Sequence, residues 1–315
     1  MRPPLPTLVL AARTLVGFAF AAGAPAAAQP EGADGRLDVL VVTAHPDDET
    51  LMAATLYKLA RELGANVDLA LVTDGSGGFD FALMGERYYG REIDTEPEAR
   101  DNLPPIRRNE LLGAGRVLGL RNVFFIDEYD HRYTTDVDTV LQHVWDVEDV
   151  LDRLGEILRR VPYDFVLGLL PVAGTHGHHK GATILALEAV AALPAARRPL
   201  VLGADFAEHA ALPAPGAPPY AFTGLVGYPI TRVDPAAPVL RFDRTQPMEG
   251  DHVATYQLVV NWALAEHKSQ GDLASYYDDV GSEYFWFFAA NDPARISDAE
   301  ALFARLNDNP YVPSP

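Results

Sequence analysis

The chain has 315 residues and a formal net charge of −19, and 48% of its residues are hydrophobic. A chain of this length can bury one sizeable core, and so acidic a surface repels nucleic acid and anionic membranes. The absence of cysteine excludes disulfides, thiolate metal sites and a cysteine nucleophile.

The first residues have the pattern of an export signal. Arg2 and Arg13 precede a short apolar run, 14–28, which is rich in alanine and ends in a small-residue cleavage site. The run is too short and too poor in large apolar residues for a good membrane-spanning helix. We therefore expect a cleaved signal peptide over 1–28, a linker over 29–36 and an exported protein, periplasmic or extracellular, without stable membrane insertion. An uncleaved membrane anchor is the alternative.

From residue 37 the chain alternates between strand and helix patterns. Short apolar runs typical of buried parallel strands cover 37–43, 67–73, 123–126 and 165–170. Apolar residues at helical spacing cover about 56–63, 106–118, 147–158 and 180–192. This order predicts an α/β fold with a Rossmann-like, mostly parallel sheet flanked by helices, in a single domain over 37–315.

Two stretches interrupt this alternation. Residues 75–103 form a glycine- and acid-rich connection, which we expect to fold over the carboxyl edge of the sheet. Its aromatic residues either wall a substrate pocket or pack within the loop: Phe79, Phe81, Tyr88 and Tyr89. The section around 207–250 is irregular and rich in proline and alanine, with a short strand-like piece over 225–230. Neither stretch resembles an independent domain.

Side chains suited to chemistry gather after the first and fourth predicted strands. The first cluster is Ala-His-Pro-Asp-Asp-Glu, 44–49, and the second is Thr-His-Gly-His-His, 175–179. Because reactive groups of open α/β sheets collect at the carboxyl ends of the strands, we expect both clusters at one edge of the sheet. The active site is therefore predicted at that edge.

A zinc site without thiolates needs imidazoles and a carboxylate, with one position left open for water. His45, Asp48 and His179 supply such a set, and Asp47 lies beside it without being needed as a ligand. Taken singly, the acidic residues could merely cap a helix and the histidines could be solvated loop residues. The two clusters together favour a metal site.

These motifs resemble the PIG-L/LmbE-like family of zinc-dependent de-N-acetylases. That family includes the N-acetylglucosaminyl-phosphatidylinositol de-N-acetylase and the mycothiol-pathway deacetylase. The resemblance rests on the 44–49 motif and on motifs spread over nearly the whole mature chain: Thr73-Asp74-Gly75, Arg107-x-x-Glu110, His176-x-x-His179, Glu266 to Gln270 and Ser282 to Phe285.

The resemblance implies a role for each matching residue. His45, Asp48 and His179 match the metal ligands, Asp47 the general base, and His176 the histidine that stabilises the tetrahedral intermediate or protonates the leaving amine. Two further matches look like substrate-contacting residues, namely Arg107 and Asp130. In one respect the chain departs from the family, since His178 replaces an aspartate that would support a histidine electrostatically.

Together these features predict a metal-dependent amidohydrolase that uses Zn²⁺ and releases acetate from an N-acetylated amino sugar or its conjugate. The partner is thus a small-molecule or glycoconjugate substrate, while the oligomeric state is left open. Two alternatives share the residues: a metal-binding carbohydrate-recognition protein that has lost turnover, and a non-haem iron enzyme with two histidines and one carboxylate. Acetate release from N-acetylated sugars distinguishes all three.

Overall fold

The computed structural model describes residues 35–206, 221–248, 253–273 and 281–309. The predicted signal peptide over 1–28 lies outside the described residues. Within the described parts of the chain, no helix is both long enough and apolar enough to cross a membrane.

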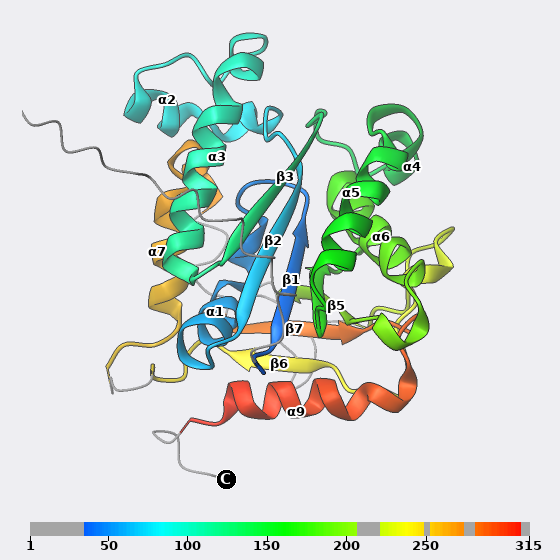
Figure 1. Ribbon diagram of the computed structural model, residues 1–315. Coiled ribbons are helices and arrows are strands. Elements are labelled where there is room, and N and C mark those ends of the chain that lie inside the picture. The colour runs from blue at the N-terminus through cyan, green and yellow to red at the C-terminus, as the bar shows by residue number, and fades with distance from the viewer. Residues whose placement is uncertain (1–34, 207–220, 249–252, 274–280, 310–315) are drawn as a thin grey trace, which may run out of the picture.

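The strands form one seven-stranded sheet in the order β3-β2-β1-β4-β5-β7-β6 (Figure 1). Their bounds are β1 Asp38–Thr43, β2 Asn66–Thr73, β3 Asn122–Glu128, β4 Phe165–Leu169, β5 Leu200–Phe206, β6 Leu240–Asp243 and β7 Ser282–Phe287. The first five strands in this order pair in parallel, whereas β7 runs antiparallel to both β5 and β6. The predicted α/β fold with a mostly parallel sheet is confirmed.

Helices cover both faces of the sheet (Figure 1). The α-helices are α1 Ala53–Tyr57, α2 Leu83–Tyr89, α3 Glu98–Leu118, α4 Val137–Thr139, α5 Val147–Arg160, α6 Gly177–Ala191, α7 Gln257–Glu266 and α9 Ile296–Asn307. The shorter helical segments are η1 Asp48–Met52, η2 Lys58–Glu62, η3 Gly78–Phe81, η4 Val140–Val144, η5 Ala195–Arg197, η7 Pro229–Thr231, η8 Lys268–Leu273 and η9 Pro293–Arg295.

Alternate side chains of each central strand enter different cores. In β1, Val39 and Val41 pack with residues of α1, α3, α7 and α9, while Leu40 and Val42 pack with residues of α5 and α6. This follows from the two-residue period of a strand, and it explains why strands buried on both faces are apolar throughout. The covered faces leave the carboxyl edge as the place for polar groups.

Two local predictions were wrong. Helix α3 begins at Glu98 rather than at 106, with Pro104 and Pro105 inside it. Its added first turns bury Ala99 and Leu103 in a small cluster with Phe79 and Ile93, which outweighs the hydrogen bonds that the prolines cannot donate. The strand-like piece over 225–230 forms turns that lead into η7, because Pro229 starts a tight helical turn there.

The antiparallel edge of the sheet is joined to η1 and α1 by a buried ion pair. Glu283 of β7 accepts hydrogen bonds from the N–H groups of Ala54 and Thr55, and Arg244 donates to it from 2.9 Å. Both charged side chains are fully buried. The C-terminal Ser-Glu-Tyr-Phe motif therefore helps to hold the helical segment after the 44–49 cluster against the sheet.

We expect Glu283→Gln to lower the free energy of unfolding by about 2 kcal/mol, because a neutral amide weakens a buried, charge-assisted network. Urea unfolding followed by circular dichroism measures this loss. Glu300→Gln, on the exposed side of α9, is the matched control and should change stability little. Equal stability of the two variants would contradict the structural role of Glu283.

Candidate metal centre

Both predicted clusters lie at the carboxyl edge of the sheet. Residues 44–49 follow β1, and 175–179 follow β4 and begin α6. Since β1 and β4 pair directly in parallel, their ends are neighbours and the two clusters face each other. The structure therefore has both clusters at one edge of the sheet, as predicted.

Three ligand atoms converge between these clusters. Asp48 Oδ1 lies 3.0 Å from His179 Nε2, and His45 Nδ1 lies 3.0 Å from the same nitrogen and 3.6 Å from Asp48 Oδ1. The other carboxylate oxygen of Asp48 accepts hydrogen bonds from the N–H groups of Ala44 and His45, at 2.9 and 2.8 Å. Those bonds fix Asp48 with one oxygen turned to the histidines, so the three residues could hold a metal ion.

Each histidine of this set has a partner on its second ring nitrogen. His179 Nδ1 lies 2.9 Å from the hydroxyl of Thr175. His45 Nε2 lies 3.4 Å from Asp130 Oδ1 and 3.0 Å from His178 Nδ1. Partners of this kind fix the tautomer and the orientation of a metal-binding imidazole. The set is therefore pre-organised.

The electrostatic potential at the convergence point favours positive charge. Burial lowers the pKa of His45, but the carboxylates of Asp130 and Asp48 outweigh it and raise the pKa to about 10. Burial raises the pKa of Asp48, yet His179 and His45 hold it well below its usual range. A divalent cation would meet the same negative potential at this point.

Asp47 has an unusual backbone conformation, with φ 144° and ψ −20°. Its N–H donates to Glu49 Oε2 at 3.1 Å, and its carbonyl accepts from the N–H and hydroxyl of Thr50. Non-glycine residues at such φ values carry strain that surrounding contacts must hold in place. The different directions of the Asp47 and Asp48 side chains come from this backbone, because Asp47 precedes the helical turn that begins at Asp48.

The side chain of Asp47 is held by Arg107. Arg107 donates to Asp47 Oδ2 at 2.7 Å and to the carbonyl oxygens of Gly75 and Pro46 at 2.8 and 3.0 Å. Burial raises the pKa of Asp47 to about 6, although the nearby charge of Arg107 opposes the rise. The carboxylate is thus buried, oriented and separate from the atoms that converge on the metal position.

His176 caps the N-terminus of α6. Its Nδ1 accepts a hydrogen bond from the N–H of His178 at 3.0 Å, so Nδ1 must be unprotonated and a neutral ring carries its proton on Nε2. Burial, together with the neighbouring His45, His178 and His179, lowers the pKa of His176. The ring also contacts Tyr133 edge-on, with 4.9 Å between centroids. His176 is therefore arranged as a neutral hydrogen-bond donor.

The two residues expected to contact substrate, Arg107 and Asp130, are each only 2% exposed. Both line the cavity, but their polar atoms also bind protein groups, and Arg107 Nη1 lies 3.6 Å from Asp130 Oδ2. The backbone at Gly77 and Gly78 packs closely against these two side chains. A Cβ at Gly77 would lie 2.6 Å from Asp130 Oδ1, and a Cβ at Gly78 would lie 2.4 Å from Arg107 Nη1. Only glycine fits this close approach.

Sequence reasoning missed a buried pair beneath the site. Glu49 Oε1 lies 2.5 Å from His267 Nε2, while its other oxygen accepts the N–H of Asp47. Nearby, Glu110 accepts from the N–H and hydroxyl of Ser269. The signal was present in the Glu266-to-Gln270 motif, but contacts between residues so far apart in the chain cannot be inferred from spacing.

The site opens into a cavity of about 900 Å³. One part of its lining is polar and includes Asp47, Arg107, Asp130, His176 and Gln270; another is apolar and includes Leu51, Leu169, Leu170, Val172, Phe222 and Leu273. Of the four loop aromatics, Phe81 lines this cavity, Phe79 packs in a small core cluster, and the Tyr89 hydroxyl donates to Glu110. Tyr88 is exposed.

The chain is similar to one family model, to curated relatives and to solved structures. Residues 40–190 match the PIG-L family, described as GlcNAc-PI de-N-acetylase. Two curated relatives, the probable N-acetyl-alpha-D-glucosaminyl L-malate deacetylases 2 of Bacillus cereus and Bacillus subtilis, are each 26% identical. These matches cover 52% and 45% of this chain, and 65% and 55% of the relatives' own lengths, less than two thirds in both cases.

Solved structures show the same fold. A deacetylase triple mutant involved in the teicoplanin biosynthetic pathway is similar with a TM-score of 0.53 at 18% identity. The match covers 82% of this chain and 99% of that chain. At this identity the likeness concerns the fold alone.

Proposed function

Residues 40–190 belong to the PIG-L family, and from this premise we propose that the protein is a hydrolase that removes an acetyl group from an N-acetylated amino sugar or its conjugate. The observation that carries the proposal is the convergence of His45 Nδ1, Asp48 Oδ1 and His179 Nε2 beside the oriented carboxylate of Asp47. The names of the curated relatives support the same reaction class.

Zinc fits the three ligand atoms. Tetrahedral coordination with bonds of about 2.0–2.2 Å places neighbouring ligand atoms about 3.3 Å apart. The observed separations of 3.0, 3.0 and 3.6 Å lie on either side of that value. The donor set, two imidazoles and one carboxylate with a position left open, is typical of catalytic zinc. When bound, the ion would make water more acidic and polarise the substrate carbonyl.

In the proposed mechanism, Asp47 accepts a proton from the attacking water. As the water oxygen bonds to the amide carbon, Asp47 accepts the proton, and Arg107 keeps its carboxylate in place. The carbonyl oxygen becomes an oxyanion, towards which the Nε2–H of His176 can donate. When the carbon–nitrogen bond breaks, the proton on Asp47 passes to the nitrogen. The products are a free amine and acetic acid, which then loses its remaining proton to water and becomes acetate.

The helix cap favours one of the two roles considered for His176. A protonated imidazole would need its Nδ1 as a donor, yet that atom accepts the N–H of His178. Protonation of Nδ1 would therefore break this capping hydrogen bond, and an N-cap typically stabilises a helix by about 1 kcal/mol. This supports His176 as the donor to the oxyanion, and in the proposed mechanism Asp47 then delivers the proton to the leaving amine.

The cavity supports a conjugate rather than a free monosaccharide. Its volume of about 900 Å³ lies near the upper end of pockets that hold drug-sized ligands. We expect glycosides of N-acetylglucosamine with a phenyl or octyl aglycone to have a kcat/KM about tenfold higher than the free sugar, because the aglycone buries apolar surface. Release of acetate and primary amine across such a panel measures this.

Two outcomes of the panel would change the proposal. Equal kcat/KM values for the free sugar and both glycosides would contradict the proposal that the substrate is a conjugate. If the glycosides do react faster, Phe222→Ser should reduce the ratio of their kcat/KM to that of the free sugar. Binding of the sugars without any acetate release would favour the carbohydrate-recognition alternative, and oxidation of the substrate would favour the iron enzyme.

A variant of Asp130 tests whether its contact with His45 strengthens metal binding. We expect Asp130→Asn to weaken zinc binding by about 10- to 100-fold, because a metal-binding imidazole loses its carboxylate partner. Competition with a chromogenic chelator measures the affinity. Asp127→Asn, an exposed change three residues earlier, is the matched control. A raised KM with unchanged zinc affinity would show instead that Asp130 contacts substrate.

A further inference from the structure

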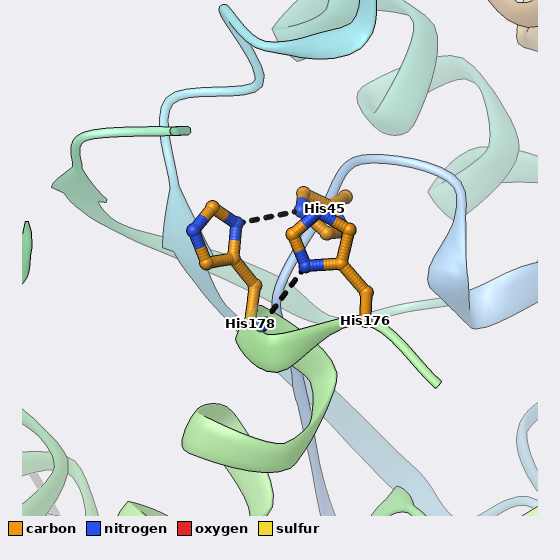
Figure 2. A group of neighbouring side chains, drawn as sticks. All are labelled: His45, His176 and His178. Carbon is orange, nitrogen blue, oxygen red and sulfur yellow. Dashed lines mark hydrogen bonds between the residues drawn. The ribbon is translucent and has the colours of Figure 1, made fainter. Parts of the chain in front are cut away.

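A second group of ligand atoms lies on the other side of the His45 ring. His45, His176 and His178 each offer a ring nitrogen, and these atoms all lie within 4.8 Å of one another. Figure 2 shows the three rings turned towards one another, with His45 from the β1 end and the other two from the start of α6. His45 Nε2 and His178 Nδ1 are 3.0 Å apart. This group uses the opposite nitrogen of His45 from the metal centre described above.

A carboxylate completes the group. Asp130 Oδ1 lies 3.4 Å from His45 Nε2 and 3.3 Å from His178 Nδ1. Together with the 3.0 Å contact between the two nitrogens, these separations also match the spacing of about 3.3 Å between ligands of one tetrahedral zinc ion. Two imidazoles and a carboxylate therefore already stand at ligand spacing, with His176 beside them.

Among the described residues, the polar contacts of the His178 ring are those of its Nδ1 with His45 and Asp130. His178 is fully buried, and its Nε2 has no hydrogen-bond partner among the described residues. Its Nδ1 faces His45 and Asp130. A buried imidazole with one nitrogen unpaired is costly unless the other makes a strong interaction. A cation at Nδ1 would supply one.

We propose that His45, His176, His178 and Asp130 form a second site for a divalent cation, joined to the first through the ring of His45. A ring that binds through Nδ1 and Nε2 at once must lose its remaining proton, so filling the second site releases one proton from His45 Nε2. That extra deprotonation makes the second site weaker than the first, and it fills when the metal is in excess.

Occupation of the second site should inhibit the enzyme. A cation bound to His176 draws its ring away from the substrate carbonyl, to which the proposed mechanism has it donate. This consequence rests on the proposed function, whereas the existence of the site does not. His178, where the family usually has aspartate, supplies the ligand that makes this second group possible.

Zinc stoichiometry tests the site without any substrate. Tag-free, metal-free protein is dialysed against increasing ZnCl₂, and bound zinc is measured by mass spectrometry of the metal. The wild type should bind two equivalents and His178→Gln one. His143→Gln, the same change at an exposed position in η4, should bind two. A wild type that saturates at one equivalent, or a His178→Gln variant that still binds two, overturns the proposal.

Acetate release provides the second measurement. Activity should peak near one equivalent of zinc and fall at least fivefold at saturation in the wild type, and the fall should be absent in His178→Gln. Inhibition of equal size in both proteins also overturns the second site. Failure of the proposed function would appear differently, as no acetate at one equivalent, and would leave the stoichiometry result standing.

Discussion

Asp48→Ala is expected to lose zinc affinity and activity together. About 10–16 kcal/mol of zinc binding is shared among four ligands in well-formed sites, so removal of one should weaken binding by roughly 10²- to 10³-fold. At stoichiometric zinc the variant then remains largely metal-free and inactive. Competition with a chromogenic chelator gives the affinity, and acetate release gives the rate.

A second ligand variant separates this effect from misfolding. Asp48 also accepts two backbone N–H groups, and its removal can disturb the 44–49 turn. His179 lies on the first turn of α6, where its ring contacts Thr175, His45 and Asp48. His179→Ala should lose zinc to a similar extent, while His143→Ala should bind zinc as the wild type does. Unchanged zinc affinity in both ligand variants would contradict the assigned metal centre.

Asp47→Asn should keep its zinc and lose turnover. An amide has nearly the shape of the carboxylate and can still accept from Arg107, but it cannot take up a proton from water. Removal of a general base costs typically 10²-fold or more in rate. Metal analysis beside single-turnover acetate formation separates binding from chemistry. Full activity in this variant would rule out Asp47 as the base, and loss of its zinc would mean that the roles of Asp47 and Asp48 are exchanged.

The sheet and the position of the site could be predicted because each depends on local patterns. Apolar runs at strand length gave four of the parallel strands, and the clusters after the first and fourth fell at one edge because those strands are neighbours. The antiparallel β7 and β6 were missed. β7 pairs with β5, about 80 residues earlier in the chain, and with β6, and neither pairing is a tight hairpin that turn residues would indicate.

The contacts that hold the site residues in place could not be predicted from the sequence for a similar reason. The φ of Asp47, which sets the direction of its side chain, depends on Glu49, Thr50 and the distant Arg107. Asp130 was expected to contact substrate, but its place beside His45 and His178 follows from how β3 aligns with β1 through β2. Residue type and spacing identify groups that can do chemistry, whereas tertiary packing decides which of them meet.

The most direct test of the central claim is acetate release by the metal-free protein before and after addition of one equivalent of zinc. The substrate is a phenyl glycoside of N-acetylglucosamine, and both acetate and primary amine are measured. The account predicts no release without metal, and equal amounts of the two products once one zinc per chain is bound. Release at the same rate from metal-free protein, or none from protein that carries one zinc, would contradict it.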